Sequence, residues 1–347
     1  METVWFVIVA LATAAYAATD GFDLGIGVLF PLLGRNDVER GTVRATMSHL
    51  WRAYEVWLIV LGALLFMAFP RLYAVSFSGF YLAFMILLWC LIGRGLSLEV
   101  RSHLGQPVWR AACDILFPIA SFLIAFALGA AAGNVVRGVP LLEERGQLFL
   151  PLWTNLSLQA GPAIFDWYTL ITGALAVAAF ALHGANYVAL KTTDELRQRA
   201  RRMALWSALP TGALGVASFL LAPRINPGLL TNYEAHPGLY LIVALTVGAF
   251  IATVLLEAFG RDLGAFGASG LLIVAAVASI AVALYPNLLP ATPDPRYSLT
   301  IYNAAATPYG LTVALIWFII GLTLIGVYML VTHRPFVGRV RAGSEEY

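Results

Sequence analysis

Long apolar runs separated by short polar breaks make up most of the chain. Nine runs are each long enough, or nearly so, to cross a hydrocarbon core of about 30 Å as a helix. They cover residues 3–33, 54–69, 74–97, 112–133, 166–190, 203–222, 238–258, 265–286 and 308–332. The pattern predicts an all-α polytopic membrane protein with about nine transmembrane helices.

The longest polar breaks indicate how the spans are grouped. Residues 35–51 begin with an acidic turn and continue with apolar residues at helical spacing, which fits either an amphipathic helix on the membrane face or a solvated loop. Residues 134–165 contain several prolines and are expected to fold over the opposite, outer face. We therefore predict a first four-helix bundle at 1–133, a second at 166–286, and an outer loop, ninth helix and tail at 287–347.

Composition agrees with a membrane location and excludes several classes of function. Of the 347 residues, 60% are hydrophobic and 12% charged, whereas soluble proteins are about 25% charged. A net charge of +2 gives no basic surface to neutralise phosphates, which excludes nucleic acid as a partner. The two cysteines, Cys90 and Cys113, form neither a disulfide framework nor a metal motif.

Basic residues are divided unevenly between the two sides that nine spans define. Sixteen of the 21 lie on one side, a count that treats Arg94 and Arg101 as loop residues. Short cytoplasmic loops collect Lys and Arg. We therefore predict that the N-terminus lies outside and the C-terminus in the cytoplasm.

A few ionisable residues fall within the predicted spans. A charge near the bilayer centre costs about 2.5 kcal/mol or more, so such residues mark proton paths, cofactors or partner contacts. Asp20 and Asp23 are three residues apart and share one face of the first helix, and Glu55 lies near the start of the second. Two carboxylates in a dry site rarely both ionise, so one of them can carry a proton. The alternatives for the aspartates are interfacial helix caps or partners of an arginine such as Arg94.

Other polar residues have simpler interpretations. Glu99 and Glu257 lie close to arginines, which favours interfacial ion pairs, and Asp114 and Asp166 are predicted to cap the starts of their helices. His183 is a candidate haem ligand, but a lone intramembrane histidine is more often hydrogen-bonded to a neighbouring helix. The histidines have no haem-clamping spacing, and we expect no metal site in this chain.

Five stretches of the sequence resemble subunit II of cytochrome bd-type quinol oxidases. They are residues 19–27 (TDGFDLGIG), residues 55–59 with 68–70 and 77–81, residues 94–101 (RGLSLEVR), residues 183–187 with 191–192, and residues 285–290 with 298–304. The resemblance runs through most of the chain. It implies a nine-helix subunit built as two four-helix bundles plus one peripheral helix.

The resemblance also implies a function. The chain would be the haem-free subunit II of a quinol:oxygen oxidoreductase in the cytoplasmic (inner) membrane of a bacterium or archaeon, and would not be catalytic alone. Subunit I, its partner, would carry haems b and d, or b only, and use quinol as substrate. Subunit II would support subunit I and line a proton path from the cytoplasm for the reduction of O2 to water. Membrane lipids, a structural quinone and small single-span subunits are further partners that the resemblance allows.

One position departs from the family pattern. The family usually has an acid directly after the tryptophan that opens the second helix, whereas here Arg52 follows Trp51. Arginine stays protonated near neutral pH and repels an incoming hydronium ion, so we expect Arg52 to pair with a carboxylate or a lipid phosphate. The candidate proton-path residues are Asp20, Asp23 and Glu55, and the candidate supporting residues are Arg52, Glu99 and His183.

Two alternative functions stay open at this point. The first is a bd-like, quinone-linked redox complex that does not reduce oxygen, which the departure at Arg52 leaves open. The second is a solute or ion transporter, because transporters also use buried carboxylates and intramembrane glycines.

Overall fold

A computed structural model describes residues 1–47, 50–101, 106–141, 148, 150–153, 163–292, 294–333 and 338–340. These residues form α-helices, a few short 3₁₀ turns and one two-stranded sheet. The helices are α1 (Glu2–Leu33), α2 (Asp37–Met47), α3 (Leu50–Ala68), α4 (Pro70–Gly79), α5 (Tyr81–Val100), α6 (Pro107–Arg137), α7 (Trp167–Lys191), α8 (Asp194–Ile225), α9 (Thr231–Ala235), α10 (Tyr240–Ala258), α11 (Asp262–Leu284) and α12 (Pro308–His333). The strands β1 (Asn287–Leu289) and β2 (Leu299–Thr300) pair antiparallel.

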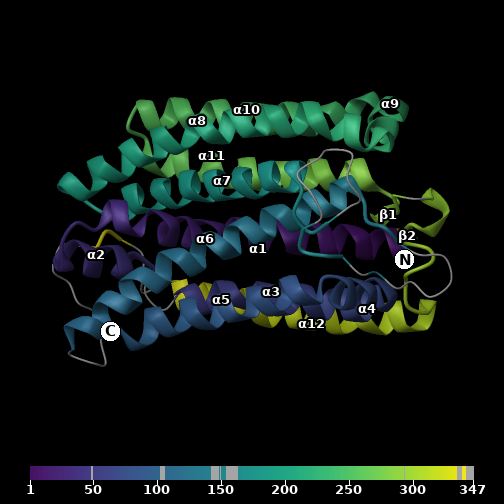
Figure 1. The fold of residues 1–347 in the computed structure, drawn as a ribbon, viewed down its shortest axis with the longest axis horizontal. Coiled ribbons are helices and arrows are strands. Elements are labelled where there is room, and N and C mark those ends of the chain that lie inside the picture. The colour runs from purple at the N-terminus through teal and green to yellow at the C-terminus, as the bar shows by residue number, and fades with distance from the viewer. Residues whose placement is uncertain are drawn as a thin grey trace.

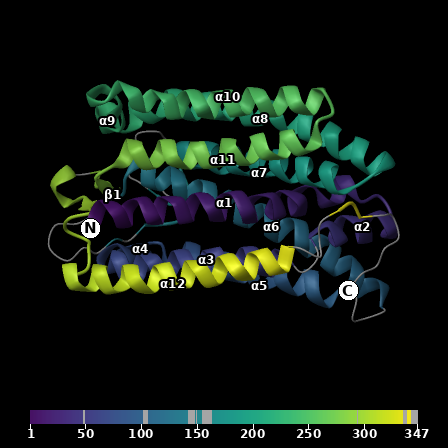
Figure 2. The same cartoon turned by 180° about the vertical axis from the view of Figure 1, so that it is seen from behind.

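The long helices run side by side along the long axis of the molecule (Figure 1). From one edge to the other, α8 and α10 are followed by α7 and α11, then by α1 and α6, and finally by α3, α5 and α12 (Figure 2). The N-terminus and the β1–β2 sheet lie at one end of the bundle, which we call the N-terminal end. The amphipathic helix α2 lies at the opposite end, which we call the α2 end.

Eight helices of the described chain are long and apolar enough to cross a membrane, which confirms the all-α polytopic class. They are α1, α5, α6, α7, α8, α10, α11 and α12. The remaining predicted span corresponds to α3, whose apolar stretch Tyr54–Ala68 is shorter than the others. The predicted count of nine is therefore not reproduced by length and hydropathy alone.

The third predicted span, residues 74–97, is wrong at its start. The chain leaves helical geometry at Phe80, between α4 and α5. At the end of α4, Gly79 lies under Leu148, and a Cβ at this position would come within 2.4 Å of the leucine side chain. The break therefore coincides with the close approach of Leu148, which is about 70 residues further along the chain. Hydropathy does not record such a contact.

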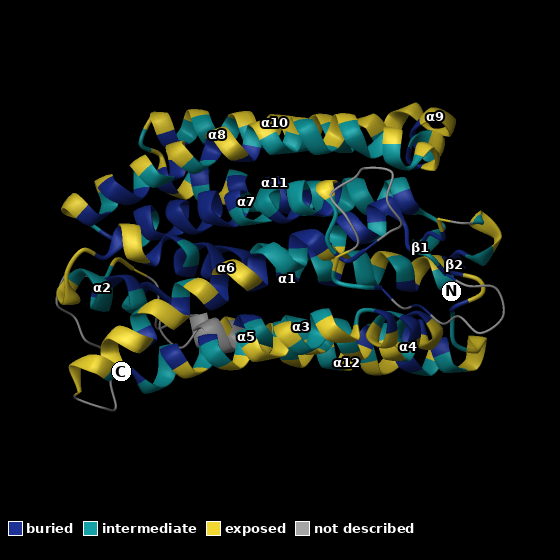
Figure 3. Cartoon of the chain, viewed as in Figure 1, coloured by how far each residue is buried: buried dark blue, intermediate teal, exposed yellow. Residues whose placement is uncertain are grey.

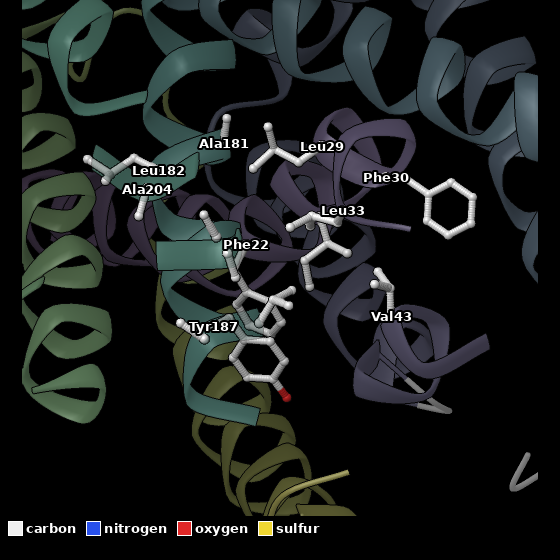
Figure 4. Close-up of a cluster of buried hydrophobic side chains, with 14 of the residues drawn as sticks. Phe22, Leu29, Phe30, Leu33, Val43, Ala181, Leu182, Tyr187 and Ala204 are labelled. Carbon is white, nitrogen blue, oxygen red and sulfur yellow. The ribbon is translucent and has the colours of Figure 1, made fainter. Parts of the chain in front are cut away.

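Burial is concentrated in the middle of the helix stack (Figure 3). Helix α1 packs against α3, α6, α7 and α11, so it contacts helices from both halves of the chain. The largest buried cluster joins α1, α2, α7 and α8, and in it the rings of Phe22 and Tyr187 stack 4.2 Å apart (Figure 4). The outer helices α8, α10 and α12 expose many large apolar side chains, as expected of surfaces that face lipid or a partner.

The predicted amphipathic segment is helical over α2, which removes the loop alternative for those residues. Its Glu39 receives two hydrogen bonds from Arg199, at 2.7 and 3.1 Å, and Arg199 also donates to the carbonyl oxygen of Leu33 at the end of α1. The hydrogen bonds from Arg199 hold the pKa of Glu39 below its ordinary value. Arg199 thus fixes α2 to the end of the bundle.

The two predicted helix caps have different outcomes. Asp166 caps α7, because its side chain accepts from the backbone N–H of Thr169 while the Thr169 hydroxyl accepts from the backbone N–H of Asp166. The prediction that Asp114 caps its helix is wrong, because α6 begins seven residues earlier at Pro107. Instead Asp114 accepts hydrogen bonds from Arg101 and Arg40.

Candidate functional site

Three carboxylates from two helices surround one buried arginine, a group that we call the acid cluster (Asp20, Asp23, Glu55 and Arg94). Arg94 Nη2 lies 2.6 Å from Asp23 Oδ2, and Arg94 Nη1 lies 3.0 Å from Glu55 Oε1 and 3.8 Å from Asp20 Oδ1. Helix α1 supplies both aspartates from one face, α3 supplies Glu55, and α5 supplies Arg94. All three predicted proton-path residues therefore lie in one place.

Arg94 is not among the candidate site residues, but the sequence names it as an alternative partner of the aspartates, and its contacts with Asp23 and Asp20 confirm that alternative. The count of basic residues treats it as a loop residue, but it lies inside α5 and its side chain is 0% exposed. The counting of loop charges is wrong on this point. The usable signal was that the predicted span 74–97 already contains Arg94, and α5 in fact continues for six residues beyond it, which places its Cα about 9 Å inside the helix end.

The cluster carries more negative groups than positive ones. If all three carboxylates were ionised, one guanidinium would leave two negative charges unbalanced in a buried site, which is strongly unfavourable. Both oxygens of Asp20, Oδ1 of Asp23 and Nε of Arg94 are buried without a hydrogen-bond partner among the described residues. Buried polar atoms of this kind usually contact ordered water or change protonation state. The arrangement is therefore able to hold and exchange protons.

The members of the cluster differ in their access to the surface of the chain. The side chains of Asp20 and Asp23 are each 1% exposed, whereas that of Glu55 is 28% exposed. Glu55 is therefore the point at which this cluster communicates with the surroundings of the chain. Arg94 contacts both Glu55 and Asp23, so it holds a partly exposed and a buried carboxylate close together.

His183 lies on α7 and joins three helices. Its Nε2 lies 3.1 Å from the carbonyl oxygen of Ala18 on α1, and its Nδ1 lies 2.7 Å from Ser269 Oγ on α11. A carbonyl only accepts, so Nε2 donates, and the single hydroxyl hydrogen of Ser269 lies within reach of both Nδ1 and the carbonyl oxygen of Phe266, 2.9 Å from Ser269 Oγ. Because both ring nitrogens are engaged, the contacts fit the hydrogen-bonded alternative for His183 and do not fit iron ligation.

The remaining predicted site residues lie apart from the acid cluster or outside the description. Glu99 lies in the last turn of α5 and is half-buried. It is five residues beyond Arg94, which is a rotation of about 140° around the helix, so the two side chains leave α5 on different faces. The side chain of Arg52 lies outside the described part of the chain. Glu257, for which an ion pair was expected, receives a hydrogen bond from Arg201 on α8 at 3.0 Å. Within the described residues, no group of three His, Cys, Asp or Glu side chains could hold a metal ion.

The fold and the acid cluster define a polytopic helical membrane protein with several carboxylates inside its helix bundle. The model of the family described as cytochrome bd terminal oxidase subunit II matches residues 1–336. The chain therefore belongs to the cytochrome bd terminal oxidase subunit II family. As a member, it is a multi-pass subunit of an oxidoreductase complex in the inner membrane.

Similar proteins come from several bacteria. The chain is 28% identical to a probable cytochrome oxidase subunit 2 of Haemophilus influenzae, over 99% of this chain and 96% of that protein. It is 29% identical to the cytochrome bd-I ubiquinol oxidase subunit 2 of Escherichia coli K12, over 96% and 92%, and 27% identical to the cytochrome bd ubiquinol oxidase subunit 2 of Bacillus subtilis, over 96% and 98%.

A solved structure has the same fold. The bd oxidase of Geobacillus thermodenitrificans includes a chain that matches with a TM-score of 0.75 and 20% sequence identity, over 97% of this chain and 98% of that one. The match supports the fold and leaves the roles of individual residues to be argued from this chain.

Proposed function

We propose that this chain is the haem-free subunit of a quinol:oxygen oxidoreductase and conducts protons through the acid cluster toward a haem-bearing subunit I. The observation that carries the proposal is that three carboxylates share one buried guanidinium, while only Glu55 reaches the surface. The α2 end, which holds most of the basic residues, would face the cytoplasm and the N-terminus would lie outside. Protons would then enter from the cytoplasm.

Each residue of the cluster has a role in this proposal. Glu55 exchanges protons with the surroundings, and Asp23 and Asp20 hold them inside the bundle. Arg94 keeps Glu55 and Asp23 in place and supplies the charge that keeps part of the cluster ionised, so that a proton can be accepted. The unpaired oxygens of Asp20 and Asp23 are where water molecules would link the carboxylates.

Haem belongs on the partner subunit in this proposal. The one buried histidine that was a candidate ligand uses both ring nitrogens in hydrogen bonds. The haems of subunit I, of b and d type or b type only, would supply the redox chemistry of quinol oxidation and oxygen reduction. This chain would conduct protons to subunit I and provide a surface against which subunit I packs.

The test is proton uptake by the complete complex in proteoliposomes. We expect Asp23→Asn and Glu55→Gln each to lower proton uptake and oxygen consumption by about 100-fold, the scale at which losing a proton-transfer group acts. The haem absorbance of the complex should stay unchanged, because the haems lie on the partner.

A matched control is Glu234→Gln, which removes an exposed carboxylate in α9 at the N-terminal end. This variant should take up protons at the normal rate. Normal uptake and turnover in both Asp23→Asn and Glu55→Gln would overturn the proposal.

Family membership also bears on the alternatives. No feature of the described chain favours a solute transporter over an oxidase subunit. The non-oxygen-reducing alternative rested on Arg52, whose side chain lies outside the described part of the chain.

A further inference from the structure

One face of α1 carries a tyrosine in line with the two aspartates of the acid cluster. Tyr16, Asp20 and Asp23 follow one another at spacings of four and three residues, so they lie on the same face of the helix. Over these positions the helix rises about 10 Å. Tyr16 is 4% exposed, Asp20 1% and Asp23 0%. Tyr16 therefore continues the line of buried polar side chains by one turn toward the N-terminal end.

The side chain of Tyr16 lies beside that of Asp20. A side chain in a helix points back over the preceding turn, so the carboxyl group of Asp20 lies over the turn that holds Tyr16. The Tyr16 hydroxyl interacts electrostatically with Asp20 and, at longer range, with Arg94 and Glu55. Neither oxygen of Asp20 has a hydrogen-bond partner among the described residues, so the hydroxyl is close to the carboxyl without being bonded to it. A phenol both accepts and donates a hydrogen bond, so it can receive one proton and release another.

Beyond Tyr16 the same face of α1 becomes apolar. Ala12 is 5% exposed and Trp5 0%, and both belong to an apolar cluster with residues of α3, α4 and α12. The nearest hydroxyl of α1 in this direction, that of Thr13, lies about 60° round the helix and donates to the carbonyl oxygen of Val9 on its own helix. Among the described residues of α1, the line of polar side chains therefore ends at Tyr16, near the middle of the helix.

This arrangement limits where a proton can go. From Tyr16 to Trp5 the apolar face extends for about 16 Å along α1, and a charge without polar partners is costly in such surroundings. A proton that enters the acid cluster at Glu55 therefore finds polar groups as far as Tyr16 and an apolar wall beyond it. The path through this face of α1 is closed toward the N-terminal end, so a proton at Tyr16 leaves sideways, out of the helix.

We propose that Tyr16 is the last proton-transfer group of this chain and passes protons from Asp20 to subunit I, an inference that rests on the proposed function. The Tyr16 oxygen accepts the proton that leaves the Asp20 carboxyl group, while the O–H proton of Tyr16 passes to the next acceptor, a water molecule or a group of subunit I. Asp20 becomes a carboxylate and the phenol is neutral before and after the transfer. The new O–H bond then rotates toward the exit, which leaves the oxygen ready for the next proton.

The experiment compares Tyr16→Phe with the unmodified complex in proteoliposomes, in H2O and in D2O. The substitution removes one oxygen and keeps the ring. We expect proton uptake and oxygen consumption to fall about tenfold, less than in Asp23→Asn, because water can partly replace a hydroxyl group. The ratio of the rates in H2O and D2O should rise, since proton transfer becomes the slowest step. The haem absorbance and the melting temperature should stay unchanged.

Two further variants separate the chemistry of Tyr16 from its shape. Tyr168→Phe removes the hydroxyl of another buried tyrosine, on α7, which lies 3.4 Å from Ser218 Oγ. This variant should show normal uptake and a normal isotope effect. Tyr16→His places a different ring at position 16 that can also accept and donate a proton. It should retain clearly more uptake than Tyr16→Phe.

The outcomes distinguish this inference from the proposed function. Normal uptake in Tyr16→Phe, together with impaired uptake in Asp23→Asn, would overturn the role of Tyr16 and leave the proton path in place. Equal losses in Tyr16→Phe and Tyr16→His with an unchanged isotope effect would show that only the shape of the side chain matters, which also overturns it. Normal uptake in both Asp23→Asn and Glu55→Gln would remove the proton path itself.

Discussion

Two buried arginines, Arg137 at the N-terminal end of the bundle and Arg94 in its interior, have opposite surroundings. At the N-terminal end, Arg137 donates from Nε to the carbonyl oxygen of Gly138, from Nη1 to Asp166 and from Nη2 to Asn134 Oδ1. Asp166 in turn caps α7 through the backbone N–H of Thr169. One positive group meets one negative group, and the hydrogen-bonding groups of the arginine are used.

Arg94 differs in both respects. It contacts three carboxylates, its Nε has no partner among the described residues, and several of the facing oxygens are also unpaired. An ion pair with balanced charges and complete hydrogen bonds holds two segments together, and its two groups stay ionised. An unbalanced cluster is stabilised by taking up protons, which is the property that a proton path needs. The comparison separates a structural arginine from a functional one without using the family.

The largest expected effect is on stability at the N-terminal end. Arg137→Met removes the counter-charge of Asp166, whose side chain is only 15% exposed, and should cost about 3 kcal/mol, seen as a lower melting temperature of the purified complex. Arg94→Met should cost less, because the carboxylates of the acid cluster can become neutral by protonation. The double variant Arg137→Met with Asp166→Asn should recover much of the loss, since asparagine still caps a helix. Equal losses for the two arginines would refute the contrast.

A smaller effect is expected from removing one carboxylate charge at each site. Asp20 accepts no hydrogen bond from a described residue, and Asp20→Asn removes both the repulsion from Asp23 and the attraction to Arg94 at 3.8 Å. These two changes oppose each other, so stability should change by less than about 1 kcal/mol while proton uptake falls about tenfold. Asp166→Asn should cost about 2 kcal/mol and leave proton uptake normal. Melting curves and proteoliposome assays of the same two variants measure both quantities. Loss of uptake in Asp166→Asn would contradict the separation of roles.

The smallest effect concerns the ion pair that holds α2 to the bundle. Arg199 lowers the pKa of Glu39, so this pair stabilises the protein above the ordinary glutamate pKa of about 4.3, and the contribution is lost as pH falls through the lowered value. Glu39→Gln should therefore destabilise by about 1 kcal/mol at pH 7, and the difference should shrink as the pH falls through the lowered pKa of Glu39. Melting temperatures across this range measure the gap, and a gap that is constant with pH would exclude the ionised pair as its cause.

Several properties of the sequence were sufficient to predict parts of the fold. Apolar runs located the transmembrane helices, because each helix satisfies its own backbone in an apolar medium and needs only length and hydropathy to do so. The three-residue spacing of Asp20 and Asp23 placed them on one face of α1, and the position of Asp166 at the start of an apolar run predicted the cap of α7. These are local rules that act within about one helical turn.

The tertiary structure decided everything that depends on residues far apart in the chain. Arg94 meets Asp23 across 71 positions, and the break at Gly79 coincides with the packing of Leu148 against it. Hydropathy gives a buried arginine and a loop arginine the same value, so the count of loop charges placed Arg94 in a loop even though the predicted span 74–97 contains it. The sequence by itself determined which segments are helices and which helices bear carboxylates. Packing alone decided that three carboxylates share one guanidinium, because charge balance in a buried site is a property of the assembled helices.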